Sequence, residues 1–160
     1  MFNLTKDTLL LFKSFKFKNL KHFDTHDGIA YTCELYYGNQ KIADVENRGD
    51  GGMTDIDYSN SGEDLLNSLN IPQYYTDEEL GFEIDNEYII SDLVEVAIWI
   101  KDALRNQSKS IIFAKGDEIR EIKLKVPINR YAEAGKMSLL TDKVKELEDK
   151  GFVVLNTNID

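Results

Sequence analysis

The sequence predicts an α+β fold, and three observations lead to this class. Alternation of apolar and polar residues is typical of strands and occurs at 15–21, 29–37, 41–46 and 118–126. Helical spacing of apolar residues is found in a mostly apolar segment at 88–104 and in an amphipathic one at 139–150. The strands are grouped before and after the long helix, which argues against a regular βαβ array. We therefore predict a mixed or antiparallel sheet of two hairpins with a buried central helix and a C-terminal helix.

The size and composition of the chain are those of one globular domain. With 160 residues, of which 42% are hydrophobic, the chain can bury a substantial core, so we expect residues 1–160 to form a single domain. No apolar run approaches the ~18 residues that cross a bilayer, and no export signal is recognisable. Cys33 is the only cysteine and has no intrachain partner, which fits a reducing compartment. A cytoplasmic protein without a membrane partner is the expectation.

The first half of the chain contains a strong hairpin signal. Segments 29–37 and 41–46 flank Gly38-Asn39-Gln40, whose residues tolerate the positive φ angles of a tight turn. A loop is expected at 23–28, before this hairpin, and another in the glycine-rich run 47–52 after it. A short strand should follow at 53–58.

The second half is organised around the apolar segment at 88–104. Its breadth of apolar surface predicts a central helix packed on a sheet that includes both 29–37 and 118–126. A second hairpin is expected from 110–114 and 118–126, with Ile122, Leu124 and Val126 pointing inward. Gly151 is placed to end the last helix, and a strand should follow at 152–155.

The charge of the chain is concentrated in one segment. The formal net charge is −10, yet residues 44–95 hold fifteen acidic residues and a single base, Arg48, for a net charge of −14. Within it, residues 59–86 read as an acidic, loop-rich segment with a short helix at 62–69 that ends before Pro72. The acidic residues of such a block must be distributed over solvent-exposed surface, bind cations or face a basic partner. Direct binding of nucleic acid is not expected, because it depends on Lys and Arg.

Aromatic residues accompany these acids, and the combination is typical of a protein-binding surface. Carboxylates supply an electrostatic field, and tyrosines supply apolar anchors. The predicted partner-binding residues are Asp55, Asp57, Glu63, Asp64, Tyr74, Tyr75, Asp77, Glu78, Glu79, Glu83, Asp85 and Glu87.

No motif for catalysis or metal binding is complete. Asp55 and Asp57 begin like a calcium loop, but Asn60 and Leu66 stand where glycine and glutamate are required. The pattern His22-Phe-Asp-Thr-His26 lacks further ligands for a transition metal, and Cys33 belongs to an apolar strand face.

Glu121 and Lys123 share a strand face, as in the acid and lysine element of metal-dependent nucleases, but no upstream aspartate on a neighbouring strand accompanies them. No cofactor, no metal and no catalytic residue are therefore predicted.

Residues 15–58 carry a resemblance. The order Tyr31-Thr-Cys-Glu-Leu-Tyr36, Lys41-Ile-Ala-Asp-Val45 and Asn47-Arg-Gly-Asp-Gly-Gly52 resembles small uncharacterised proteins of bacteriophages and mobile elements. This resemblance implies a phage accessory protein in the bacterial cytoplasm, a class that includes anti-CRISPR and DNA-mimicking antirestriction proteins. It carries no established functional residues.

The function predicted is that of a non-enzymatic inhibitor. Its acidic surface would occupy the basic nucleic-acid-binding face of a partner such as a CRISPR nuclease or restriction enzyme. Two alternatives stay open: a small metal-dependent nuclease or hydrolase that uses Glu121 and Lys123, and an immunity protein against a basic toxin.

Overall fold

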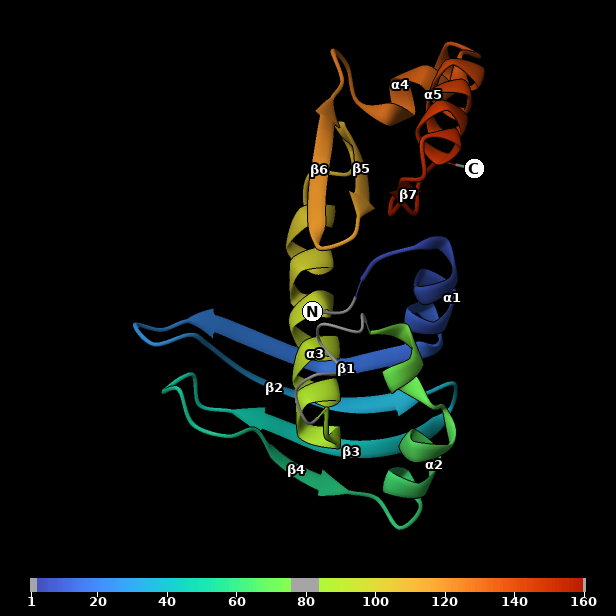
Figure 1. Ribbon diagram of the computed structural model, residues 1–160. Helices are drawn as coiled ribbons and strands as arrows, with labels where there is room; N and C mark the ends of the chain where they lie inside the picture. The colour runs from blue at the N-terminus through green and yellow to red at the C-terminus, as the bar shows by residue number, and fades with distance from the viewer. Residues whose placement is uncertain (1–2, 76–83, 160) are drawn as a thin grey trace. The chain divides into compact units, whose positions relative to one another are not determined.

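The α+β class is confirmed by the computed structural model, which describes residues 3–75 and 84–159 (Figure 1). Its strands form two antiparallel sheets, one of four strands in the order β1-β2-β3-β4 and one of three strands in the order β6-β5-β7. The two predicted hairpins thus lie in different sheets. The expectation of one sheet containing both 29–37 and 118–126 is wrong, because β2 pairs with β1 and β3, whereas β6 pairs with β5.

The chain divides into two compact units, which we describe separately. The four-stranded unit comprises Leu10–Glu95, and the three-stranded unit comprises Met1–Leu9 with Val96–Asp160. Two helices cross the boundary, α1 (Lys6–Ser14) near its middle and α3 (Asn86–Leu104) between Glu95 and Val96.

The four-stranded sheet is a continuous antiparallel meander. Its strands are β1 (Phe15–Asp24), β2 (Ile29–Tyr37), β3 (Gln40–Asn47) and β4 (Asp55–Tyr58). The β2–β3 hairpin turns at Gly38, which has a φ of 58°, as the sequence predicts. Strand β1 continues through Phe23 and Asp24, where a loop was expected, because Asp24 still pairs with Ile29.

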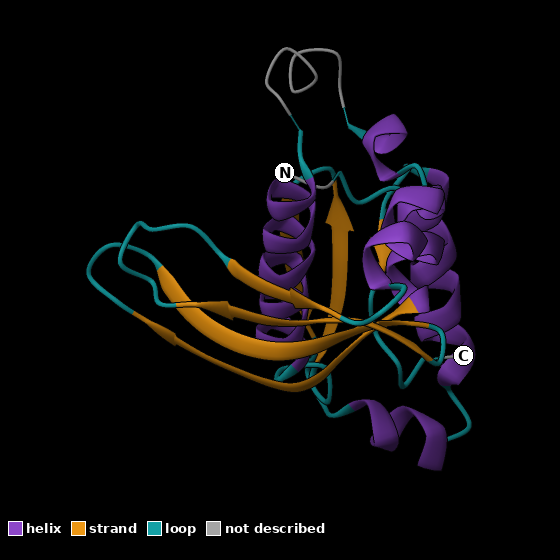
Figure 2. Cartoon of the chain, turned by 90° about the horizontal axis from the view of Figure 1, so that it is seen from below, coloured by secondary structure: helices purple, strands orange, loops and turns teal. Residues whose placement is uncertain are grey.

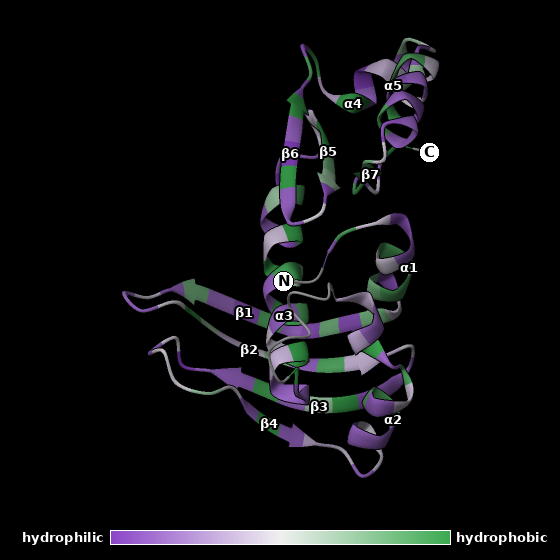
Figure 3. Ribbon diagram, in the orientation of Figure 1, coloured by the Kyte–Doolittle hydropathy of each residue, from purple (hydrophilic) through white to green (hydrophobic). Residues whose placement is uncertain are grey.

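Alternation along the strands separates two faces of this sheet. Tyr31, Cys33 and Leu35 of β2 are buried, whereas Thr32 between them is exposed. Figure 3 shows the corresponding alternation of hydrophobic and hydrophilic residues along the strands. The inner face lies against the N-terminal half of α3, which crosses the sheet (Figures 1 and 2). We call the opposite side the outer face.

Helix α3 is buried over most of the predicted apolar surface. Ile90, Leu93, Val94 and Ile98 are at most 1% exposed, so the prediction of a buried helix is confirmed. Ile100 lies seven residues after Leu93, and so on the same side of the helix, but it is only half-buried. A charge at this position should therefore be less damaging than one at Leu93.

Short helical segments follow β4. Helix α2 (Gly62–Ser68) is close to the predicted 62–69. It ends through Asn70, whose φ is 47°, rather than at Pro72. Pro72 instead lies in the first turn of a 3₁₀ helix, η1 (Ile71–Tyr74), where its missing N–H costs no hydrogen bond.

The three-stranded unit has its own hydrophobic core. Strands β5 (Ser110–Lys115), β6 (Glu118–Lys123) and β7 (Val153–Val154) are accompanied by α4 (Ile128–Glu133) and α5 (Met137–Asp149). The core residues come from β5 and the two helices: Ile111, Phe113, Ile128, Leu140 and Leu147.

The ends of elements in this unit depart from the predictions in two places. Strand β6 stops at Lys123, three residues early, and Val126 is 43% exposed rather than inward-facing. The reason is that Leu124 N–H already bonds to Lys109 O, beyond the end of the β5 ladder. Gly151 ends α5 as predicted, with a φ of 81°.

Candidate partner-binding face

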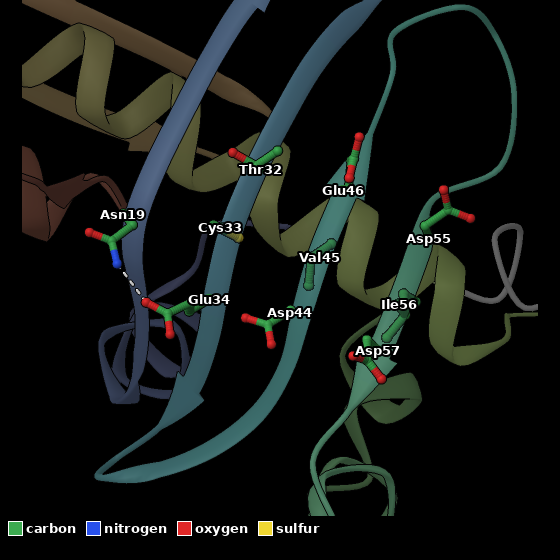
Figure 4. Close-up of a pocket in the computed structure, with 10 residues that line it drawn as sticks. All are labelled: Asn19, Thr32, Cys33, Glu34, Asp44, Val45, Glu46, Asp55, Ile56 and Asp57. Atoms are coloured by element: carbon green, nitrogen blue, oxygen red, sulfur yellow. Dashed lines mark hydrogen bonds between the residues drawn. The ribbon is translucent and has the colours of Figure 1, made fainter.

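Four carboxylates gather on the outer face of the four-stranded sheet. Asp44 and Glu46 are exposed on β3, and Asp55 and Asp57 are exposed on β4. The register pairs Asp44 with Asp57 and Glu46 with Asp55, so the four residues form two rows (Figure 4). We call them the acidic quartet. The backbone positions of neighbouring quartet residues are ~4.8 Å apart across the strands and roughly 6.8 Å apart along each strand.

A hollow of about 470 Å³ lies over this part of the sheet. The alternation of the strands places the side chains of the quartet, with Thr32 and Glu34 of β2, around it (Figure 4). Asn19 closes one side, and its side-chain amide donates to Glu34 at 2.5 Å. Asn19 has a φ of 54° and lies in the irregularity between Lys18 and Lys21, which turns its side chain toward the hollow.

The carboxylates of this face differ in how far they are neutralised. Lys41 Nζ lies 2.8 Å from Asp44 and 3.3 Å from Glu34, so it compensates both. Arg48 reaches only 4.0 Å from Asp55, and both side chains are more than 70% exposed. Glu46 and Asp57 have no ion pair within the described part of the chain. The β4 side of the face therefore projects uncompensated negative charge into solvent.

The opposite edge of the same face is basic. Lys16, Lys18 and Lys21 are exposed along β1. Lys16 Nζ donates to Asn39 at 2.9 Å, and Lys18 Nζ lies 4.0 Å from the centre of the Tyr36 ring. Lys21 makes no ion pair among residues 3–75 and 84–159. The outer face thus carries positive charge along one edge and negative charge along the other.

Two large apolar side chains are exposed at the loop end of this sheet. Phe23, near the end of β1, is 66% exposed, and Met53, two residues before β4, is 79% exposed. Exposed aromatic and methionine side chains are enriched in protein interfaces.

The structure divides the predicted partner-binding residues between several places. Asp55 and Asp57 belong to the quartet. Glu63 and Asp64 are exposed on α2 and do not line the hollow. Burial, then the negative charge of Glu63, raises the pKa of the Tyr58 phenol.

The two predicted tyrosine anchors are not equivalent. Tyr75 is 6% exposed and its hydroxyl donates to Asp92 at 2.8 Å, so this side chain is part of the core rather than of a surface. Its ring packs edge-on against Tyr88, with ring centres 5.7 Å apart. Tyr74 is half-buried at the end of η1.

The remaining predicted acids lie around the start of α3 or outside the described residues. Asp85 caps α3 by accepting the Tyr88 N–H at 2.8 Å. Glu87 accepts the Thr54 N–H at 2.8 Å, which ties α3 to the segment before β4. The four that lie outside the described residues are Asp77, Glu78, Glu79 and Glu83.

Sequence reasoning missed Glu34, Asp44 and Glu46 as site residues, although a signal was present. Alternation places these side chains on the polar face of the predicted hairpin. The signal becomes specific only when the register of β3 with β4 is known, because that register sets which acids are neighbours.

The residues of the other candidate motifs lie on several different elements. No group of three or more His, Cys, Asp or Glu side chains that could hold a metal occurs among the described residues. Burial raises the pKa of Cys33 to about 12, so its thiol is protonated at neutral pH and is a poor nucleophile. His22 lies in β1, whereas His26 lies in the turn that follows it.

Glu121 and Lys123 do share the surface of β6 and line a hollow of about 310 Å³ with Arg105, Lys109 and Ser110. Their charged groups are 3.7 Å apart. The hollow is predominantly basic.

Comparison of the chain with protein-family models, curated proteins and solved structures gives no match. The resemblance of residues 15–58 to phage proteins therefore stays a hypothesis. In residues 3–75 and 84–159, no helix combines the length and the apolar character that crossing a membrane requires.

Proposed function

We propose that the protein is a non-enzymatic binding protein whose acidic quartet engages the basic, nucleic-acid-binding face of a partner protein. The observation that carries this proposal is the two-row arrangement of Asp44, Glu46, Asp55 and Asp57 over a hollow in the outer face. Arg and Lys side chains that normally contact phosphates fit such an array, because they bind carboxylates through the same charge-assisted hydrogen bonds.

The distribution of charge between the two units supports this proposal. The four-stranded unit holds eighteen acidic residues and six basic ones, for a net charge of −12. The three-stranded unit holds eleven acidic residues and thirteen basic ones, for a net charge of +2. The four-stranded unit is therefore the part of the chain that attracts a basic partner.

Competition is the mechanism of inhibition that follows. A partner whose cationic groove is occupied by the quartet cannot neutralise phosphates, and its nucleic-acid affinity falls. Effectors of bacterial defence, such as CRISPR nucleases and restriction enzymes, have grooves of this kind, and the resemblance to phage proteins favours them. A basic toxin would present the same chemistry, and an adjacent toxin gene would favour an immunity role.

A pull-down followed by a competition assay tests this proposal. Wild-type protein should recover a basic nucleic-acid-binding protein from host lysate and should displace a labelled oligonucleotide from it. The variant D55K/D57K should reduce the association rate at least tenfold, and raised salt should weaken the wild-type complex.

The matched control is E63K/D64K, which makes the same change in net charge on α2 of the same unit. It should retain most of the competition. Equal losses in both variants would mean that only net charge matters, and the quartet would not be the site. Persistence of nucleic acid in the complex would contradict competition.

A metal-dependent hydrolase acting through Glu121 and Lys123 is the second candidate, favoured by their shared hollow with Arg105 and Lys109. The test is hydrolysis of DNA and RNA with Mg²⁺ or Mn²⁺. Cleavage that is lost in both E121A and K123A would establish it and would overturn the binding proposal. Absence of cleavage is the result we expect.

A further inference from the structure

We propose that the outer face of the four-stranded sheet also binds a second copy of this chain, through a two-fold arrangement that sets β1 of each copy over β4 of the other. This inference goes beyond the proposed function. It rests on the segregation of charge across one sheet face and on the strand register.

Two cross-strand rows define the face. One row runs Lys18, Glu34, Asp44, Asp57 from β1 to β4, and the other runs Lys21, Thr32, Glu46, Asp55. Each row therefore begins with a lysine at one edge of the sheet and ends with an aspartate at the other.

A two-fold axis parallel to the strands makes these rows complementary. Rotation about this axis reverses the order of strands and keeps each row at its own level along the sheet. Lys18 of one copy then faces Asp57 of the other, and Lys21 faces Asp55. Because the arrangement is isologous, each contact occurs twice. Stacked sheets lie ~10 Å apart, a gap that opposed lysine and aspartate side chains can bridge.

The centre of the face does not oppose this pairing. Glu34 and Asp44, which lie next to the axis, are the carboxylates that Lys41 already compensates at 3.3 and 2.8 Å. Glu46 and Asp57 have no ion pair in the described part of the chain. Glu46 would face Thr32 of the other copy across the axis, whereas Asp57 lies at the flank, as does Lys21. Repulsion at the axis is thus reduced, whereas attraction is available on both sides of it.

The exposed apolar residues follow the same symmetry. Phe23 lies two residues beyond Lys21 on β1, and Met53 lies two residues beyond Asp55 at the same end of the sheet. Since β1 and β4 run in opposite directions, the two-fold operation brings Phe23 of one copy near Met53 of the other. These contacts would remove apolar surface from water in both halves of the interface.

The small area of the face limits the affinity of the dimer. A face of four strands, roughly 15 by 20 Å, is smaller than the ~800 Å² that each partner buries in a standard interface. The dimer should therefore be weak, dependent on concentration and sensitive to salt. A basic partner that takes Asp55 and Asp57 would displace the second copy.

Sedimentation equilibrium on the full chain, with variants in which the charges of the face are reversed, tests the proposal. The wild-type average mass should rise from 18.4 kDa toward twice that value between ~10 µM and ~1 mM, and fall again in ~0.5 M salt. K18E/K21E alone and D55K/D57K alone should each stay monomeric, because like charges then face each other. An equimolar mixture of the two variants should dimerise, because every contact again pairs opposite charges.

Three results would overturn the proposal: a wild type that stays monomeric over this range, dimerisation that survives K18E/K21E, or a mixture that fails to dimerise although both variants retain the wild-type circular dichroism and thermal melt. The variants also separate this inference from the proposed function. K18E/K21E should lose self-association and keep the basic partner, whereas D55K/D57K should lose both.

Discussion

At the scale of single residues, Thr54 joins three parts of the four-stranded unit. Its hydroxyl lies 2.7 Å from Ser91 Oγ of α3 and 3.3 Å from the Tyr31 hydroxyl of β2, and it accepts the Asn47 side-chain amide at 2.9 Å. A hydroxyl can donate one hydrogen bond and accept two, so these three partners use its full capacity. The network fixes the segment that leads into β4, and hence the position of Asp55.

We expect Thr54→Val, which keeps the shape of the side chain, to lower the free energy of unfolding by ~1–3 kcal/mol, because it leaves the partners of Thr54 unsatisfied. Tyr31→Phe should cost less, because it leaves the bonds of Thr54 to Ser91 and Asn47 in place. Urea denaturation measures both changes. A Thr54→Val variant as stable as the wild type would mean that the network does not hold this segment.

Glu146 is a surface residue whose carboxyl has a strongly lowered pKa. Hydrogen bonds from Lys143 and Lys150, at 2.7 and 2.6 Å, lower the pKa of its carboxyl to about 2. Because the folded-state pKa is depressed from 4.5, the stabilisation is present above pH 4.5 and is lost as the pH falls toward 2. Exposure and salt screening keep the effect on stability small.

The pKa itself is the sharper measurement. A carboxyl NMR titration should place the pKa of Glu146 well below 4.5, and replacing both Lys143 and Lys150 by Ala should return it toward that value. A wild-type Glu146 that titrates as it does in the double variant would show that the two lysines do not bind its carboxylate in solution.

At the scale of elements, the contact between α2 and β3 depends on a glycine. A Cβ on Gly62 would lie 1.9 Å from the carbonyl oxygen of Ile42. That carbonyl cannot easily move, because Ile42 is fully buried and its oxygen accepts the Ser59 N–H at 2.9 Å. Gly62 thus allows the start of α2 to lie directly on the sheet edge.

We expect Gly62→Ala to destabilise the protein by roughly 3 kcal/mol or more, because a backbone clash must be relieved by moving α2 or β3. The comparison is Gly51→Ala, where no atom lies within 4 Å of the new Cβ and only the positive φ of 77° is unfavourable, at ~1–2 kcal/mol. Chemical denaturation of both variants should rank them in that order; the reverse order would contradict the packing of α2.

At the scale of the whole molecule, the long helix α3 contributes residues to both units. Helix α3 runs from Asn86 to Leu104, and the boundary between the units falls within it, after Glu95. Unfolding of either unit would therefore remove packing from half of a continuous helix. Since helix formation is cooperative, the loss should be felt by the other half.

We accordingly predict one calorimetric transition for the full chain. Leu93→Ala in the four-stranded unit and Leu147→Ala in the three-stranded unit should each cost about 2–5 kcal/mol and lower the same Tm, because both side chains are at most 5% exposed. Two transitions, each shifted by only one of the variants, would show that the units unfold independently and that the expectation of a single domain is wrong.

Local patterns in the sequence were sufficient for most elements of the fold. Alternation around Gly38 predicted the β2–β3 hairpin, and the apolar stripes of 88–104 predicted α3, because these signals arise within a single element. The α1 helix was missed: Leu9–Phe12 gives only a short apolar run, and nine residues are too few for a clear helical period. The extension of β1 to Asp24 was missed because it depends on pairing with Ile29.

The sequence by itself determined the class of fold and the concentration of negative charge, since each depends on composition or on neighbours in the chain. Only the tertiary structure decided which charges act together. Strand register brings Asp55 and Asp57 beside Glu46 and Asp44, burial places Tyr75 in the core, and Glu87 accepts the N–H of Thr54. These outcomes depend on contacts between residues distant in the sequence, which local patterns do not specify.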